Sequence, residues 1–211
     1  EKYFDLISPW YYGGPIYRAE NQFAVFNNFK HWQEEFGGYC QKNNIVSEFQ
    51  RLNPLIENHL LYQDDPSLFC NRDIVCIDLD KPLSQIRGEY EYKVRKNIKK
   101  AEIAGLRVIH SKTETDWEKF IEVYLSSMRE KESDAFYRFN DDFYAKFFAN
   151  FHAELEIFRV EYQEKTIAAT LVLGKYGILH DYLRGSLSQY LKLRPNDFMM
   201  DSIIAWAKDS G

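Results

Sequence analysis

The sequence predicts an α/β protein (α+β in stricter usage) whose mixed, mostly antiparallel sheet carries helices on both faces. The composition supports a folded domain, because 45% of the 211 residues are hydrophobic and 17% are aromatic, enough for a sizeable core. The order of patterns after residue 105 then predicts a strand, two helices, three strands joined by tight turns, and a final helix.

The first part of the chain predicts alternating short elements. A strand at 3–7 is followed by a turn-rich loop at 8–15, a helix at 23–43 and a second strand at 45–49. The helix is predicted from aromatic residues that recur every three or four positions: Phe26, Phe29, Trp32 and Phe36. Two consecutive glycines, Gly37 and Gly38, are expected to interrupt or end it.

The later elements follow from local signals. The β-branched run 74–79 predicts a strand, and 84–104 predicts one long helix that ends at Gly105. A strand is expected over Leu106–His110. The next helix is capped by Thr113 or Thr115 and runs to about Lys131.

The end of the chain predicts two hairpins and a helix. Asn140 is expected to cap a helix over about 140–151. Strands follow at 154–162, 165–174 and 177–184, with turns at Gln163-Glu164 and Tyr176-Gly177. A loop at 185–195 then leads to a last helix, Asn196–Asp209, with Pro195 at its start.

Composition also excludes several classes of protein. A net charge of −5 argues against a protein that coats nucleic acid by charge alone. The three cysteines (Cys40, Cys70 and Cys76) form no CxxC pair and the five histidines no HExxH motif, so we expect no disulfide framework and no metal site. We also expect no tightly bound cofactor. No apolar run approaches 18 residues, and we expect a cytoplasmic protein.

The order of elements resembles that of the GNAT acyltransferase fold, and four segments are similar to the FemAB-like family and its GNAT-like relatives. The segments are Ser8-Pro9-Trp10-Tyr11-Tyr12-Gly13-Gly14-Pro15, Ser47-Glu48-Phe49-Gln50-Arg51-Leu52-Asn53-Pro54-Leu55, Arg95-Lys96-Asn97-Ile98-Lys99-Lys100-Ala101-Glu102 and Leu193-Arg194-Pro195-Asn196-Asp197. The resemblance implies two GNAT-like halves. Residues 1–71 would be the latter part of the first half, and 72–211 a second domain that lacks its last strand or strands. We therefore expect a piece of a longer protein.

The resemblance also implies an activity. FemAB-like proteins move an aminoacyl group from charged tRNA, or an acyl group from a thioester, onto an amine of a peptidoglycan or surface-polysaccharide precursor. An acyl-CoA or an aminoacyl-tRNA is therefore the implied co-substrate, and peripheral contact with a membrane-borne precursor is implied too. The alternative is a catalytically inert GNAT-like domain that binds an envelope precursor or a protein partner.

The donor site is expected at the loop 185–195. GNAT enzymes place a glycine-rich loop there, at a helix N-terminus that attracts the pyrophosphate of CoA. This sequence lacks the glycines, and Lys192 and Arg194 are expected to supply charge instead, with Ser186 and Asn196 beside the substrate. The alternative is that both cations are solvated loop residues.

A basic helix offers a second anion-binding candidate. Five cations fall within eight positions: Lys93, Arg95, Lys96, Lys99 and Lys100. Such a face suits an RNA backbone or an anionic membrane surface. We favour a solvated face balanced by acidic neighbours, namely Glu89, Glu91 and Glu102.

The acceptor site is expected in the first half. Substrate-binding candidates there are Tyr11, Tyr12, Gly13, Gly14 and Arg51, since glycines allow close approach and tyrosines offer flat faces with polar tips. Glu48 is a candidate general base for an incoming amine. The alternative for the loop of Tyr11–Gly14 is a packed turn without a ligand. The alternative for Glu48 is a surface ion pair with Arg51.

The last strand carries the remaining candidates. His180 and Asp181 are candidate catalytic residues beside the acyl cleft, and Arg184 is a candidate anion contact. The alternative for His180 is a structural role in the core. We expect Tyr12, Gly13 and Gly14 to face the same cleft as Arg184. The expected chemistry is direct attack of a deprotonated amine on an activated carbonyl, which needs positioning and oxyanion stabilisation but no nucleophilic side chain.

Overall fold

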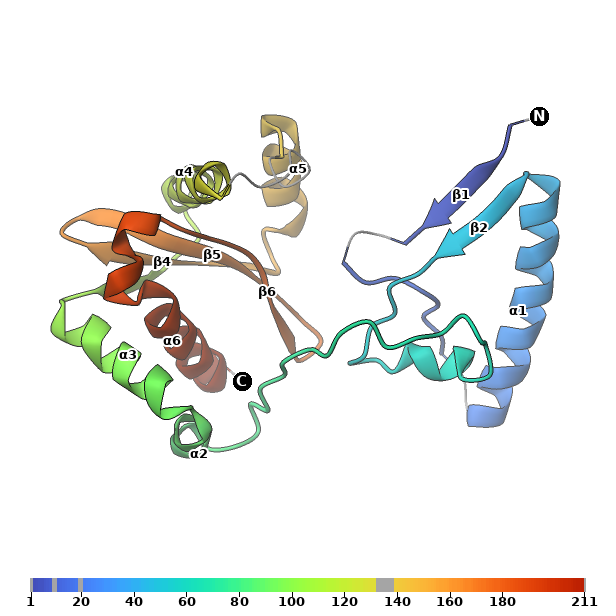
Figure 1. Ribbon diagram of the computed structural model, residues 1–211, viewed down its shortest axis with the longest axis horizontal. Helices are drawn as coiled ribbons and strands as arrows, with labels where there is room; N and C mark the ends of the chain where they lie inside the picture. The colour runs from blue at the N-terminus through green and yellow to red at the C-terminus, as the bar shows by residue number, and fades with distance from the viewer. Residues whose placement is uncertain (1, 9–10, 19–20, 132–138, 211) are drawn as a thin grey trace. The chain divides into compact units, whose positions relative to one another are not determined.

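The computed structural model describes residues 2–8, 11–18, 21–131 and 139–210, so Pro9 and Trp10 of the first family-like segment lie outside the described residues. The contacts divide the chain into two compact units, Glu1–Cys76 and Ile77–Gly211. Both are drawn in Figure 1.

The first unit is a small β-α-β arrangement. Strand β1 (Phe4–Ile7) pairs in parallel with β2 (Ile45–Phe49), and helix α1 (Gln22–Lys42) connects the two strands (Figure 1). Asn21 caps α1, because its side-chain oxygen accepts a hydrogen bond from the Ala24 N–H at 2.9 Å. A short 3-10 helix, η1 (Asn58–Tyr62), completes a small core with α1.

Helix α1 runs through Gly37 and Gly38, so the prediction that these glycines break it was wrong. Nothing lies within 4 Å of a Cβ built at either glycine, and the helix tolerates both as interior residues. The helix ends instead at Asn43 and Asn44, where Asn44 takes a left-handed φ of 56°.

Replacing Gly38 with Ala is therefore expected to stabilise the first unit by about 0.5–1 kcal/mol, since Ala loses less backbone entropy in a helix. Urea unfolding followed by circular dichroism measures the change. Gly105→Ala is the control: its surroundings are equally open, but its φ of +80° should make Ala destabilising. A destabilised Gly38→Ala variant would contradict the helical assignment.

The second unit is built on one antiparallel sheet in the order β3-β4-β5-β6. Its strands are β3 (Arg107–His110), β4 (Leu155–Tyr162), β5 (Lys165–Lys175) and β6 (Ile178–Ser186). Gln163 and Glu164 both have left-handed φ angles, 49° and 65°, as a two-residue hairpin turn requires. The predicted hairpins are confirmed.

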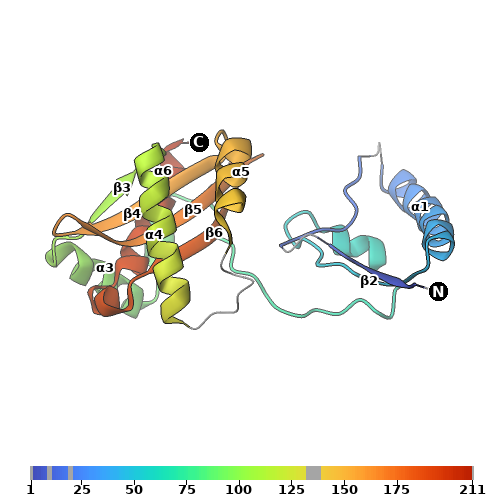
Figure 2. The ribbon, with the colours of Figure 1, turned by 90° about the horizontal axis from the view of Figure 1, so that it is seen from above.

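Helices cover both faces of this sheet, as predicted. Helix α4 (Glu114–Glu130) packs on one face and α6 (Pro195–Ser210) on the other (Figures 1 and 2). Helix α5 (Asp141–Phe151) lies beside α4, where Trp117 stacks on Phe148 with ring centroids 5.0 Å apart. Thr113 caps α4 with a capping box, and Asn140 caps α5.

The predicted helix 84–104 is two helices, α2 (Leu83–Glu89) and α3 (Tyr92–Ile103), so its continuity was predicted wrongly. The break is at Tyr90 and Glu91, whose backbone is extended. Its cause is a tertiary contact: Asp201 of α6 accepts two hydrogen bonds from Arg87, at 2.8 and 2.7 Å, and one from the Tyr90 hydroxyl at 3.1 Å. This contact holds α2 against α6.

The strand predicted over 74–79 was also wrong. Residues 71–78 have no regular secondary structure, and Val75 is 95% exposed. β-branched residues favour strands when they pack on a half-buried pleated surface, and no described strand pairs with this segment.

Candidate functional site

Strand β6 carries a bulge next to three of the predicted site residues. Leu171 of β5 pairs with Leu183, and Val172 pairs with Asp181, so Tyr182 is an extra residue in β6. Such bulges bend a strand and redirect its side chains. His180, Asp181 and Arg184 therefore lie around this irregularity.

Asp181 and Arg184 are brought together by the bulge. An Arg184 Nη2 group forms an ion pair with Asp181 Oδ2. The buried Thr170 hydroxyl lies 2.5 Å from Asp181 Oδ1 and 3.0 Å from the Leu183 carbonyl oxygen. Sequence reasoning missed Thr170, which nothing in the local pattern distinguishes from an ordinary strand residue.

His180 is half-buried on the same strand. Burial lowers its pKa, and the neighbouring charge of Asp181 opposes that shift. Burial therefore favours the neutral form of the imidazole. Its ring centroid is 6.3 Å from that of Tyr182, which stacks on Phe147 of α5 at 5.4 Å.

Ser186 and Asn196 join β6 to α6. The Ser186 hydroxyl donates to the Asn196 side-chain oxygen at 2.6 Å. The helix begins at Pro195, one residue earlier than predicted, so Asn196 lies inside its first turn and does not cap it. The Phe198 N–H instead bonds to the Arg194 carbonyl oxygen.

The segment between β6 and α6 is a 3-10 helix, η3 (Ser188–Leu193), and not an open loop as predicted. Several backbone donors here are already engaged: the Leu187 N–H bonds to Ile167 O, and the Ser188 N–H bonds to Glu130 Oε2 at 2.9 Å. The backbone therefore forms no glycine-type phosphate cradle, and any anion contact falls to side chains and the first turn of α6.

Arg194 lies together with the basic helix, which the sequence did not predict. A groove of about 760 Å³ runs along α3 and reaches Arg194 at the start of α6. It is lined by Tyr92, Arg95, Lys96, Asn97, Lys99, Lys100, Ile103 and Arg194. The predicted cations Lys93 and Lys192 are exposed and do not line it.

The charges in this groove are only partly neutralised. Arg95 bonds to the carbonyl oxygens of Gly88 and Tyr90, and Lys99 lies 3.4 Å from Glu102. Within the described residues, no ion pair engages Lys96, Lys100 or Arg194. Asn97 donates to Asp197 at 2.9 Å and so links α3 to the first turn of α6.

The predicted acceptor loop is packed against the segment after β2. The Gly13 N–H bonds to Arg51 O at 2.8 Å. Asn58, 1% exposed, donates to Gly13 O and Pro15 O. Gly14 has a φ of +88°, and a Cβ there would meet the Leu52 side chain at 2.5 Å. These contacts give the glycines a structural role.

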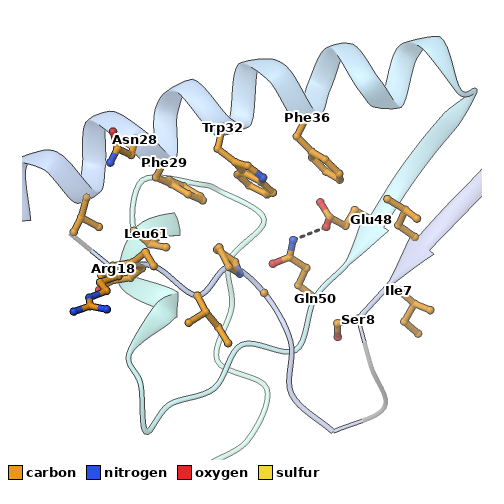
Figure 3. A pocket seen from close by; sticks show the side chains of 16 residues that line it. Ile7, Ser8, Arg18, Asn28, Phe29, Trp32, Phe36, Glu48, Gln50 and Leu61 are labelled. Carbon is orange, nitrogen blue, oxygen red and sulfur yellow. Dashed lines mark hydrogen bonds between the residues drawn. The ribbon is translucent and has the colours of Figure 1, made fainter.

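The first unit also holds a pocket of about 530 Å³ between α1 and the end of β2, shown in Figure 3. Gly14, Glu48 and Gln50 line it, whereas Tyr11, Tyr12 and Arg51 do not. Glu48 is exposed and accepts a hydrogen bond from Gln50, so the burial on which a general-base role depends is lacking. Sequence reasoning assigned Trp32 to a helix face but missed its place in this pocket.

No group of three or more His, Cys, Asp or Glu residues in the described part of the chain lies together as a metal site would need. No helix there is both long and apolar enough to cross a membrane. All three cysteines are free thiols.

Comparison with known proteins identifies the second unit. A family model described as an acetyltransferase (GNAT) domain matches residues 88–211. A solved structure titled "Crystal structure of FemX" matches with a TM-score of 0.54 and 11% identity, covering 63% of this chain and 49% of that one. This chain thus spans about half the length of FemX, and no curated protein matches it. The likeness confirms the FemAB-like resemblance at the level of the fold.

Proposed function

Because the chain belongs to the acetyltransferase (GNAT) domain family, we propose that it transfers an acyl or aminoacyl group from a phosphate-bearing donor to an amine of a cell-envelope precursor. The observation that carries the donor part is the groove that joins the cations of α3 to Arg194 at the start of α6. The envelope precursor as acceptor rests on the FemAB-like resemblance.

The donor phosphates would bind where three sources of positive potential meet. The N-terminus of α6 carries roughly half a positive charge, Arg194 adjoins it, and Lys96 and Lys100 face the same groove. Arg194 suits a bidentate contact with a phosphate, and the lysines act as point charges. An acyl-CoA and a charged tRNA share this phosphate chemistry.

The reaction would take place at the bulge of β6. The amine nitrogen forms a bond to the acyl carbonyl carbon, and the bond from that carbon to the sulfur of a thioester or the oxygen of an ester breaks. A proton leaves the amine for a neighbouring base, for which His180 and Asp181 beside the bulge are the candidates. Arg184 and backbone N–H groups near the bulge would stabilise the oxyanion.

The first unit would supply the acceptor side. We propose that residues 1–71 are the latter part of a first GNAT-like half, and that 72–211 form the second, without its last strand or strands. The loop around Tyr12 and Gly14 would border the acceptor. A membrane-borne precursor would bring the protein into peripheral contact with the cytoplasmic face of the membrane.

Replacing Lys100 and Arg194 together with Ala is expected to weaken donor binding by about 2–4 kcal/mol, taking about 1–2 kcal/mol for each charge-assisted contact. Calorimetry with acetyl-CoA and with a charged tRNA measures the loss and identifies the donor. Lys93→Ala/Lys192→Ala is the matched control, because both cations are exposed outside the groove. All four are surface residues, so the fold should persist. An equal loss in the control pair would reject the groove as the donor site.

The inert binding domain is the second candidate, and one observation favours it. Backbone donors of the segment before α6 are engaged by Ile167 and Glu130, which leaves a poorer phosphate cradle than GNAT chemistry uses. This candidate predicts an acceptor that binds without any turnover. Calorimetry with CoA, performed beside a turnover assay with amine acceptors, separates the two.

A further inference from the structure

The bulge of β6 brings two side chains of opposite charge to the same side of the sheet. In a regular strand, residues three apart point to opposite faces, and Asp181 and Arg184 would be separated. Tyr182 is the extra residue that changes this alternation, and an Arg184 Nη2 group pairs with Asp181 Oδ2. The two side chains are 27% exposed for Arg184 and 33% exposed for Asp181, so the pair is accessible to a bound molecule.

A buried hydroxyl anchors this pair from the neighbouring strand. Thr170 lies directly opposite Arg184 in the ladder and is 0% exposed. Its hydroxyl donates to Asp181 Oδ1 at 2.5 Å, a length typical of a bond to a carboxylate, whereas the Leu183 carbonyl oxygen lies farther away at 3.0 Å. Each oxygen of Asp181 therefore accepts a hydrogen bond from within the protein.

Arg184 keeps donors that the protein does not use. A guanidinium carries five N–H groups. Nη2 serves Asp181, whereas the buried Nε has no hydrogen-bond partner among the described residues. Since buried polar groups are nearly always paired, an unpaired donor in a candidate site suits an oxygen atom of a bound molecule. The contact with Asp181 fixes the plane of the guanidinium and so the direction of its remaining N–H groups.

We infer that Thr170 and Asp181 are positioning residues that act through Arg184, and that Asp181 is not the base of the reaction. Thr170 holds the Asp181 carboxylate, and the carboxylate holds the guanidinium. The guanidinium donates to the acyl carbonyl oxygen as negative charge develops on it. The amine proton then goes to His180, the other candidate base. These roles rest on the proposed function, because they apply to acyl transfer.

The first test measures acyl transfer by steady-state kinetics in single and double variants. Arg184→Gln is expected to lower kcat about 100-fold, as the loss of one oxyanion donor does. Thr170→Val keeps the shape of the side chain but removes the hydroxyl, and should lower kcat about tenfold without changing KM for the donor. In the Arg184→Gln background, Thr170→Val and Asp181→Asn should have no further effect, because the residue that they position is absent.

Two control variants accompany this test. Thr170→Ser restores the hydroxyl and should recover most of the lost kcat. Thr166→Val makes the same substitution on the same strand, at a hydroxyl that contacts Arg159 at 3.3 Å, and should be as active as the unmodified chain. Circular dichroism establishes that each variant is folded.

Two kinetic outcomes would overturn the positioning roles. One is an effect of Thr170→Val or Asp181→Asn that multiplies with that of Arg184→Gln, because independent contributions multiply. The other is a pH profile of kcat that loses a limb in Asp181→Asn and in neither Thr170→Val nor Arg184→Gln, because a base would then have been removed.

A second measurement does not require turnover. In nitrogen-15 NMR, a guanidinium held in one orientation gives two separate Nη signals, and one that rotates freely gives merged signals. The Arg184 signals, identified by their loss in Arg184→Gln, should be separate in the unmodified chain and in Thr166→Val, and should merge in Thr170→Val. Separate signals in folded Thr170→Val would reject the positioning role and leave the proposed function intact. Merged signals there, with no acyl transfer by the unmodified chain from any donor, would reject the proposed function while confirming that Thr170 holds Arg184.

Discussion

Replacing Asp116 with Ala is expected to lower the free energy of unfolding of the second unit by about 2–4 kcal/mol, because it removes a charge-assisted hydrogen bond from the buried Arg159 and part of a helix cap, while Glu161 still pairs with Arg159. Asp116 lies at the start of α4 and accepts a hydrogen bond from Arg159 Nε of β4 at 2.6 Å. The two side chains are 6% and 8% exposed. Asp116 also completes the capping box with Thr113, which the substitution removes. Urea unfolding measures the loss.

The same residue predicts an acid sensitivity. Burial would raise the pKa of Asp116, but hydrogen bonds from Ser111 and Thr113 and the charge of Arg159 outweigh it and lower the pKa to about 2. The stabilisation is therefore complete above the unfolded pKa of about 3.8 and is lost as the pH falls toward about 2. The Ala variant should lack this part of the acid dependence.

An exposed ion pair serves as the control for Asp116. Asp142 pairs with Lys146 at 2.7 Å, but their side chains are 66% and 71% exposed. Asp142→Ala should cost about 0.5 kcal/mol or less, as exposed helical pairs do. Equal losses for Asp116→Ala and Asp142→Ala would contradict the buried pairing.

Gly185→Ala is expected to destabilise the second unit by about 3 kcal/mol, at the upper end of overpacking effects. A Cβ at this position would lie 2.6 Å from the Tyr124 Cα and 2.9 Å from its backbone nitrogen. Helix α4 must therefore move away from β6, since backbone atoms cannot turn aside as a side chain can. Thermal unfolding measures the effect.

Gly174→Ala is the matched control on the neighbouring strand. Its added Cβ meets only the end of the Leu179 side chain, at 2.8 Å, which a rotamer change relieves. A loss of about 1 kcal/mol or less is expected there. If both glycine variants melt alike, the close approach of α4 to β6 is not as described.

Local signals were sufficient to predict most of the second unit. Thr113 and Asn140 cap their helices through their own side chains, and Gln163-Glu164 forms a two-residue turn, so each of these depends on neighbours within a few residues. The strands they separate were predicted for the same reason.

Features that depend on distant residues could not be predicted. The break between α2 and α3 depends on Asp201, more than 100 residues away, which binds Arg87 and Tyr90. The groove likewise joins Arg194 to Lys100, and no local pattern relates the two. The pocket of the first unit combines Trp32 of α1 with the end of β2.

The candidate site could likewise be predicted only in part from local sequence. His180, Asp181 and Arg184 were identified because they are adjacent on one strand, but the bulge at Tyr182 that arranges them depends on how β5 and β6 pair. The roles of all three, and of the residues in the first unit, stay predictions.

Acyl transfer itself tests the central claim most directly. The chain is incubated with acetyl-CoA, and separately with a charged tRNA, together with primary amines that include an amino sugar, and the products are identified by mass spectrometry. The account predicts an N-acylated amine formed in equal amount with the released CoA or tRNA, and less of it in the Lys100→Ala/Arg194→Ala variant. Donors that bind but leave every amine unmodified would contradict it.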